Sequence, residues 1–322
     1  MSSRCVTLHN GVLMPIIGCG TFNAEGDELR NGLKTAFEIG FRHIDTAVAY
    51  ENERIVGEAL KQWFDSGSGK REDFFITTKL CMGYHRRHDV ERSLKMSLEK
   101  LQLDYVDLFL VHSPMGTVFS DGKTMDYVGD HCIPDNVDHL ETWKGMEDVF
   151  NKGMTRAIGL SNYNIPQMQR VLDNCTIKPH NVQDECHIYL PQFEIVEFCK
   201  KHNIAFTAYS PLGSPGRGTH PTANLGVDNS KQLNPLACQL AKEIAAKHGK
   251  STAQILLKWL LQRDIIVVPK STIPAELQEN FNLFDFELRN EEMKALSELK
   301  TRQRIFPFWW ARNHPQYPFE KE

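Results

Sequence analysis

Short apolar runs alternate with helix-like segments along almost the whole chain, and this alternation is the strongest constraint on its fold. Between residues 27 and 40, Leu29, Leu33 and Phe37 recur at helical spacing, and Gly40 is a suitable helix stop. The strand-like runs are IIGCG, RHID, FFITT, VDLFLV, TRAIGL, HNVQ, IAFTAY and IIVVP. Near-continuous apolar strands are typical of a parallel sheet covered by helices. Eight such units predict an α/β fold, a (β/α)8 barrel that forms a single domain over residues 1–322.

Three stretches are too long to be plain connectors. Residues 113–139 and 211–232 follow the fourth and seventh predicted strands, and residues 301–322 form a tail after the last predicted helix. Loops of this length in a compact domain are usually functional, and in a barrel the loops after strands lie on the catalytic rim. We therefore expect both loops and the tail on the catalytic face.

A doubly wound dinucleotide-binding fold is the main alternative. It requires a GxGxxG fingerprint after the first strand. The chain offers Gly18-Cys19-Gly20 followed by TFN at residues 21–23, which breaks that pattern. The barrel remains the predicted fold.

Charge and cysteine content bear on location and partners. The 37 basic and 41 acidic residues give a net charge of −4, which does not suggest nucleic acid as a partner. The eight cysteines form no CxxC pair, which is typical of reduced thiols in the cytoplasm. No apolar signal region opens the sequence, and no run approaches the ~18 apolar residues of a membrane span. We expect a cytoplasmic monomer that binds neither nucleic acid nor membranes.

The histidines and cysteines do not predict a metal site. His85 and His88 flank two arginines, which indicates a solvated, charged helix start. Cys186-His187 has no second pair at ligand spacing. No metal is expected.

Three predicted strands end on ionisable groups. FRHIDTAVAY contains Asp45 and, five residues later, Tyr50, whereas FFITTK ends at Lys79 and VDLFLVH at His112. Asp45, Lys79 and His112 are separated by 34 and 33 residues, which fits one strand and one crossover helix each. The four side chains should therefore meet on one rim of the barrel.

A phenol, an ammonium, a carboxylate and an imidazole together form a proton-donating site. A cation within hydrogen-bonding reach lowers a phenol pKa, normally near 10, by roughly one to three units. We expect Lys79, paired with Asp45, to lower the pKa of Tyr50, and His112 to orient a carbonyl oxygen beside that phenol. Because no side chain delivers hydride to the carbonyl carbon, this pattern implies a nicotinamide cofactor.

Polar groups also end the later strands. Ser161, Asn162 and Gln183 offer groups that match a carboxamide, and Tyr209 offers a flat face for a heteroaromatic ring. After the eighth predicted strand, a cation and two hydroxyls precede a helix that begins near Pro274. These residues are Lys270, Ser271 and Thr272. They indicate a phosphate site.

These segments together resemble the aldo-keto reductase family, and the resemblance extends through nearly the whole chain. They are GxGTF, GFRHIDTAVAYENE, TTKL, DYVDLFLVHSP, GLSNYN, QDECHIYL, TAYSPLGSP and VPKSTIP. The resemblance implies a barrel that binds NAD(P)H without a Rossmann motif and reduces aldehydes or ketones to alcohols. The stretch DNVDHLETWKGMEDV is most similar to invertebrate members, some of which act on steroid or lipid-derived carbonyls.

The resemblance also implies roles for individual residues. Tyr50 would be the general acid, tuned by Asp45 and Lys79, while His112 would position the carbonyl and Tyr209 would stack on the nicotinamide. The rest of the cofactor site would comprise Gly20, Thr21, Phe22, Asp45, Ser161, Asn162, Gln183, Ser210, Leu212, Ser214, Lys270, Ser271, Thr272, Glu276, Glu279 and Asn280. The substrate site would comprise Phe22, Tyr50, Cys81, His112, Ser113 and Trp309.

Two departures from the family pattern concern specificity. Family members that prefer NADPH commonly carry an arginine where this chain has Glu276, a carboxylate that repels a 2′-phosphate and can accept from a free ribose hydroxyl. Lys270 favours the phosphate, so NADPH is the expected cofactor, with NADH or dual use as the alternative.

The second departure lies in the substrate pocket. The tryptophans of aldose-reductase-like members are replaced here by Phe22, Cys81, Ser113 and Thr219. The pocket should be wider and less aromatic, unless Trp309 or Trp310 of the tail folds over it.

A non-catalytic role is the alternative function. Such a protein, similar to a lens crystallin or a channel accessory subunit, would keep the fold and the cofactor. The four intact catalytic positions argue against it, because binding alone does not require them.

Overall fold

Strands and helices alternate throughout the computed structural model, which describes residues 4–118, 127–128, 131–216 and 233–320. One sheet contains eight strands, all in parallel register with their neighbours. They are β3 (Cys19–Gly20), β4 (His43–Asp45), β5 (Phe75–Leu80), β6 (Leu108–Val111), β9 (Ile158–Ser161), β10 (Asn181–Glu185), β11 (Ala205–Tyr209) and β12 (Ile266–Val267). The eight strand predictions are thus confirmed, although the first and the eighth strand are each only two residues long.

The first and last strands meet and close the sheet into a barrel. Isolated parallel bridges join Ile17 to Val267 and Gly20 to Lys270. Backbone hydrogen bonds support them, including Gly18 N–H to Val267 O at 2.8 Å. Together with the surrounding helices this confirms the (β/α)8 barrel.

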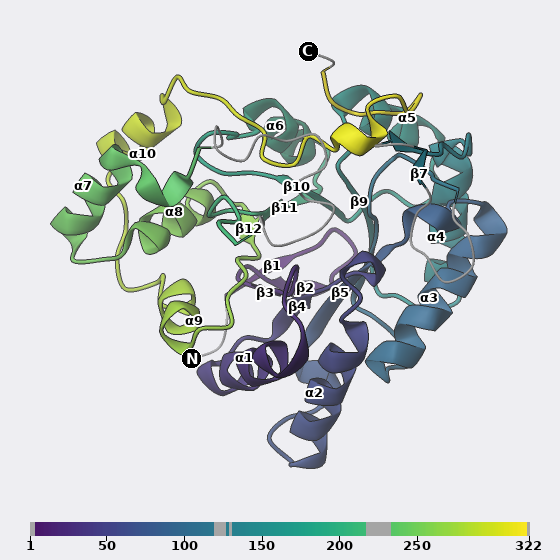
Figure 1. The fold of residues 1–322 in the computed structure, drawn as a ribbon, viewed down its shortest axis with the longest axis horizontal. Coiled ribbons are helices and arrows are strands. Elements are labelled where there is room, and N and C mark those ends of the chain that lie inside the picture. The colour runs from purple at the N-terminus through teal and green to yellow at the C-terminus, as the bar shows by residue number, and fades with distance from the viewer. Residues whose placement is uncertain (1–3, 119–126, 129–130, 217–232, 321–322) are drawn as a thin grey trace.

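Helices surround the strands in the order of the chain (Figure 1). They are α1 (Gly26–Ile39), α2 (Glu53–Asp65), α3 (Arg87–Leu101), α4 (His139–Asn151), α5 (Ile165–Asn174), α6 (Phe193–Lys201), α7 (Gln239–His248), α8 (Thr252–Leu261), α9 (Pro274–Phe281) and α10 (Asn290–Ser297). Two helices, α7 and α8, follow β11, and α10 comes after the last unit.

Local sequence signals explain several of these boundaries. The helix predicted over residues 27–40 is α1, which buries Leu29, Leu33 and Phe37 and ends where Gly40 adopts a φ of 121°. Asn164 and Gln167 form a capping box at the start of α5, each side chain accepting from the other's backbone N–H.

A hairpin that was not predicted covers the bottom of the barrel. Strands β1 (Cys5–Thr7) and β2 (Leu13–Pro15) pair antiparallel. Leu8, Val12 and Met14 of this segment pack against barrel residues that include Phe75 and Leu108. The bottom is thus filled by apolar side chains, and any site must lie at the opposite end.

Close strand packing explains one glycine. A Cβ on Gly159 in β9 would lie 2.2 Å from the carbonyl oxygen of Asn181 in the neighbouring β10. Any larger residue would push the two strands apart at the level below Ser161 and Gln183.

The predicted loops and tail are described in part. The first loop contains the hairpin of β7 (Tyr127–Val128) and β8 (His131–Cys132). Thr219, expected at the pocket from the second loop, lies outside the described residues. The tail crosses the barrel from α10 toward α5, as Figure 1 shows in yellow. None of the helices in the described ranges combines the length and apolar character that a bilayer crossing requires.

Candidate active site

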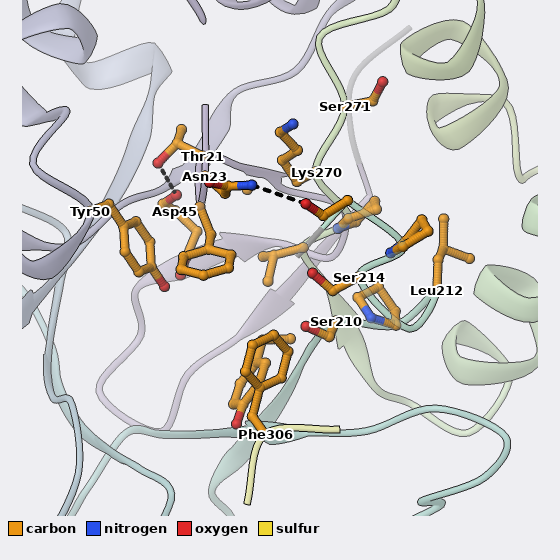
Figure 2. Close-up of a pocket in the computed structure, with 18 of the residues that line it drawn as sticks. Thr21, Asn23, Asp45, Tyr50, Ser210, Leu212, Ser214, Lys270, Ser271 and Phe306 are labelled. Atoms are coloured by element: carbon orange, nitrogen blue, oxygen red, sulfur yellow. Dashed lines mark hydrogen bonds between the residues drawn. The ribbon is translucent and has the colours of Figure 1, made fainter. Parts of the chain in front are cut away.

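The catalytic end of the barrel contains a cavity of about 770 Å³. That volume lies within the range typical of small-molecule and cofactor sites. Of the predicted residues, those that line it are Gly20, Thr21, Phe22, Asp45, Tyr50, His112, Ser113, Ser161, Asn162, Gln183, Tyr209, Ser210, Leu212, Ser214, Lys270, Ser271, Thr272, Glu276, Glu279, Asn280 and Trp309. Figure 2 shows Tyr50 and Asp45 on one side of the cavity and Lys270 and Ser271 on the other.

A buried lysine links the two groups expected to handle the proton. Lys79 is 1% exposed. Its Nζ donates to Asp45 Oδ1 at 2.6 Å, to the backbone oxygen of Thr46 at 2.9 Å and to Tyr50 Oη at 3.2 Å. The other Asp45 oxygen accepts from Gln183 Nε2 at 2.7 Å. Lys79 itself lies behind the cavity wall, so it can act on a ligand through Tyr50.

Charge and burial set the protonation states of this group. Burial lowers the pKa of Lys79, but the charges and hydrogen bonds of Asp45 and Tyr50 together outweigh that effect, and the overall pKa is raised. Burial also raises the pKa of Tyr50, and the opposing effect of Lys79 does not overcome it. The expectation of a lowered Tyr50 pKa is therefore wrong, because burial of the phenol outweighs the effect of the Lys79 ammonium. Tyr50 keeps its proton at neutral pH.

His112 faces Tyr50 across the cavity floor. The two rings meet edge to face, with centroids 5.8 Å apart. Burial, together with Lys79 and then His85, lowers the pKa of His112 to about 3. The imidazole is neutral at physiological pH, so its single N–H can donate a hydrogen bond to a carbonyl oxygen while the ring carries no charge.

An amide and a phenol are joined on the opposite wall. Tyr209 Oη donates to Asn162 Oδ1 at 2.7 Å, and Asn162 Nδ2 donates to the backbone oxygen of His112 at 2.8 Å. Asn162, Ser210 and Ser214 have positive φ values of 61°, 48° and 47°. Such strained backbone conformations cluster at ligand sites.

Two carboxylates surround the predicted phosphate site. Ser271 Oγ donates to Glu276 Oε2 at 2.7 Å, and Thr272 Oγ1 donates to Glu28 Oε1 at 2.5 Å. The same Glu28 oxygen lies 4.0 Å from Lys270 Nζ. The cation is thus partly neutralised by a residue from the first turn of α1, which the sequence did not suggest.

Aromatic residues of the tail form part of the cavity wall. Phe306, Phe308, Trp309 and Trp310 all line it. The expected folding of the tail over the pocket is confirmed. The tail makes the pocket more aromatic than the replacement of tryptophans by Phe22, Cys81 and Ser113 suggested. Cys81 is buried and does not belong to the lining residues, whereas its neighbour Met82 does.

Comparison with known proteins identifies the family. Residues 16–301 match the model described as "Aldo/keto reductase family". The chain belongs to the aldo/keto reductase family. It is 39% identical to chicken aldo-keto reductase family 1 member A1 over 332 residues, covering 99% of both chains, and 39% identical to the human protein of that name.

Solved aldo-keto reductases also share the fold. The aldose reductase of Schistosoma japonicum has a TM-score of 0.90 and 38% identity, with 99% of both chains covered. The aldo-keto reductase of Bombyx mori, solved in complex with NADP, has a TM-score of 0.88 and 34% identity, covering 99% of this chain and 100% of that one.

The sequence missed some lining residues of this aldo-keto reductase. Phe306, Phe308, Met82 and Glu28 were not predicted. Trp309 and Trp310 gave a signal for the tail, but nothing local marked the two phenylalanines beside them. In the described residues no group of three or more metal-ligating side chains comes together.

His85 is buried, contrary to the prediction of a solvated position. His85 was expected at a solvated helix start, but it is 1% exposed, and neither ring nitrogen has a hydrogen-bond partner among the described residues. Burial, then His314 and His139, lowers its pKa to about 3. The ring is therefore buried in its neutral form.

This burial predicts an acid-sensitive stability. Below about pH 6.5 the unfolded chain binds a proton at His85 that the folded protein cannot bind, so stability falls as pH falls toward 3. Between pH 7 and 5 this amounts to about 2 kcal/mol for one such histidine. We expect urea titrations at pH 7, 6 and 5 to show that the unfolding free energy falls less steeply with decreasing pH in His85→Gln than in the wild-type protein. The exposed His88 provides the matched control, since His88→Gln should keep the wild-type slope. Equal slopes in all three proteins would contradict the prediction.

Proposed function

We propose that this protein is an NADPH-dependent carbonyl reductase that converts aldehydes or ketones to alcohols, with Tyr50 as the proton donor. The observation that carries the proposal is the buried Lys79 ammonium, which contacts both the Asp45 carboxylate and the Tyr50 phenol at the cavity wall. Family membership and the NADP complex of the Bombyx mori relative support the cofactor. We further propose that it acts as a cytoplasmic monomer built of one barrel domain.

The residues of the cavity fit a nicotinamide dinucleotide. Amide groups of Asn162 and Gln183 line the cavity together with the half-buried ring of Tyr209, which suits a carboxamide-bearing ring. Lys270 and the N-terminus of α9 lie at the other end and suit a phosphate. When bound, NADPH supplies the hydride that reduces the carbonyl carbon.

The chain's own residues supply the other half of the reaction. His112, neutral and edge-on to Tyr50, orients the carbonyl oxygen within reach of the phenol. Tyr50 gives its proton to that oxygen as negative charge develops there, and Lys79 stabilises the tyrosinate that remains. Asp45 keeps Lys79 charged and in position.

A carbonyl panel tests this function. Purified protein is mixed with a series of aldehydes and ketones, in parallel with NADPH and NADH, and cofactor oxidation is followed at 340 nm. The proposal expects turnover of reactive aldehydes with NADPH. Lack of oxidation of either cofactor across the panel would contradict it and would favour the non-catalytic alternative.

Glu276 is expected to limit the preference for NADPH. Its carboxylate lies at the Ser271 hydroxyl beside Lys270, where it repels a 2′-phosphate. We predict that Glu276→Arg lowers the KM for NADPH by about tenfold, equivalent to ~1.4 kcal/mol, and leaves the KM for NADH nearly unchanged. Glu291→Arg on α10 makes the same change in net charge away from the cavity and should alter neither KM. An unchanged ratio of the two KM values in Glu276→Arg would refute this role.

A further inference from the structure

A second buried carboxylate lies beside the reaction group but takes no part in it. Glu185 ends β10, two residues after Gln183, and its side chain is 0% exposed. Its Oε1 accepts from the backbone N–H of Ile305 at 2.6 Å and from His187 Nε2 at 2.9 Å. Its Oε2 accepts from the backbone N–H of Phe306 at 2.7 Å. Three donors, two of them from the distant tail, thus converge on one carboxylate.

The three donors favour the ionised form of Glu185. Tyr189 N–H donates to His187 Nδ1 at 3.2 Å, so Nε2 is the ring nitrogen that donates to Glu185. Burial raises the pKa of Glu185, but its contacts with His187, Arg304 and Ile305 lower it overall. Oδ1 of the neighbouring Asp184 lies 3.6 Å from Nη1 of Arg304. The two adjacent carboxylates therefore contact three successive residues of the tail, 304–306.

The segment held by Glu185 forms a wall of the active site. The Phe306 ring lies 6.0 Å from the ring of Phe22 and 6.0 Å from that of Tyr209, edge to face in both cases. Phe22 in turn lies 5.2 Å from the ring of Tyr50. Figure 2 shows Phe306 at the edge of the cavity. An unbroken series of contacts therefore runs from Glu185 through Phe306 and Phe22 to the proton donor.

Other contacts hold the tail further along. His314 Nε2 contacts the backbone oxygen of Gly116 at 2.8 Å, and Gln316 Nε2 donates to that of Val137 at 2.7 Å. On the near side, Gln303 N–H donates to Tyr189 O at 2.9 Å. Removal of the Glu185 carboxylate should therefore loosen residues 305–306, which it holds directly, while Asp184 still contacts Arg304 and Tyr317 Oη still donates to the backbone oxygen of Pro307.

We propose that Glu185 is a positioning residue for catalysis, which fixes Phe306 between Phe22 and Tyr209 and thereby sets the affinity of the site for its carbonyl substrate. This inference rests on the proposed reductase function. Glu185 contacts the tail backbone, and it acts on the substrate through Phe306.

Hydrogen exchange tests the attachment without using activity. In Glu185→Ala we expect the amides of Ile305 and Phe306 to exchange at least about tenfold faster, because they lose bonds to a charged acceptor. The matched control is Glu147→Ala. Buried Glu147 accepts from the backbone N–H of Thr176 and Ile177 at 2.6 and 2.7 Å, outside the cavity lining. That variant should accelerate exchange at 176–177 and leave 305–306 unchanged.

Kinetics test the consequence for substrate. With benzaldehyde and NADPH, Glu185→Ala should raise the KM for the aldehyde by about tenfold and change kcat and the NADPH Kd by less than about threefold. Glu147→Ala should keep all three values. Glu185→Gln keeps one acceptor oxygen but turns an NH2 group toward one of the donors, so its KM should be intermediate. It also serves as the test variant if the alanine protein does not fold.

A double-mutant cycle separates positioning from general destabilisation. If Glu185 acts through Phe306, then Phe306→Ala should raise the aldehyde KM to a similar extent, and the double variant should show no further increase. If the two substitutions each raise the aldehyde KM and the double variant shows the product of both increases, the inference is overturned. An unchanged KM in Glu185→Ala would overturn it as well.

Absence of turnover in the wild-type protein would instead refute the proposed function, while the exchange experiment would still report on the attachment.

Discussion

Tyr50→Phe is expected to lower kcat for aldehyde reduction by roughly 10²–10⁴-fold, the usual contribution of a positioned general acid. The variant removes one oxygen, the atom that lies 3.2 Å from Lys79 Nζ, and keeps the ring that packs edge to face against Phe22 and His112. The NADPH Kd should change little, since the fold and the cofactor groove are untouched. Steady-state kinetics at saturating NADPH and aldehyde give kcat, and fluorescence titration gives the Kd for NADPH.

Tyr163→Phe is the matched control for this prediction. Tyr163 is also a buried tyrosine, and its hydroxyl has no hydrogen-bond partner among the described residues. It does not belong to the residues that line the cavity. Its variant should retain wild-type kcat. Equal kcat values for Tyr50→Phe and wild type would exclude Tyr50 as the proton donor.

Lys79→Met is expected to reduce both activity and stability. It removes the cation that stabilises the tyrosinate, and it leaves the Asp45 carboxylate buried without its charge partner at 2.6 Å. Breaking a buried ion pair by removing one partner typically costs about 3–5 kcal/mol. We therefore expect the unfolding free energy to fall by this amount and kcat to fall by at least about 10²-fold.

The double variant Asp45→Asn/Lys79→Met separates these two effects. It replaces the uncompensated carboxylate with a neutral amide that still accepts from Gln183, so most of the lost stability should return. The lost activity should not return, because the cation beside Tyr50 is still missing. Denaturant unfolding and steady-state kinetics on the three proteins provide the measurements. Wild-type kcat in the double variant would contradict the role of Lys79.

Strand ends were predictable from the sequence because parallel strands place their carboxyl ends on one rim. Asp45, Lys79 and His112 each end a predicted strand, and they are separated by nearly equal intervals of 34 and 33 residues, so their meeting follows from the fold class. The same logic placed Asn162, Gln183 and Tyr209 around the cavity. Periodicity alone sufficed for this part of the site.

Residues whose position depends on long-range contacts could not be predicted. Phe306 is held by Glu185, 121 residues away. Glu28 accepts from Thr272 at the predicted phosphate site, although 244 residues separate the two. His85 has the local pattern of a surface helix start, and only tertiary packing buries it. The direction of the Tyr50 pKa shift depends on the same kind of burial, which no neighbouring residue in the sequence reveals.

The fate of the hydrogen transferred to the substrate tests the central claim most directly. NADPH that carries deuterium at both C4 positions is incubated with benzaldehyde and the enzyme, and the product is analysed by mass spectrometry. Reduction at this site predicts benzyl alcohol with one deuterium on its carbinol carbon, formed in equal amount to the NADPH oxidised, and far more slowly by Tyr50→Phe. Benzyl alcohol without deuterium, or no alcohol at all, would contradict the account.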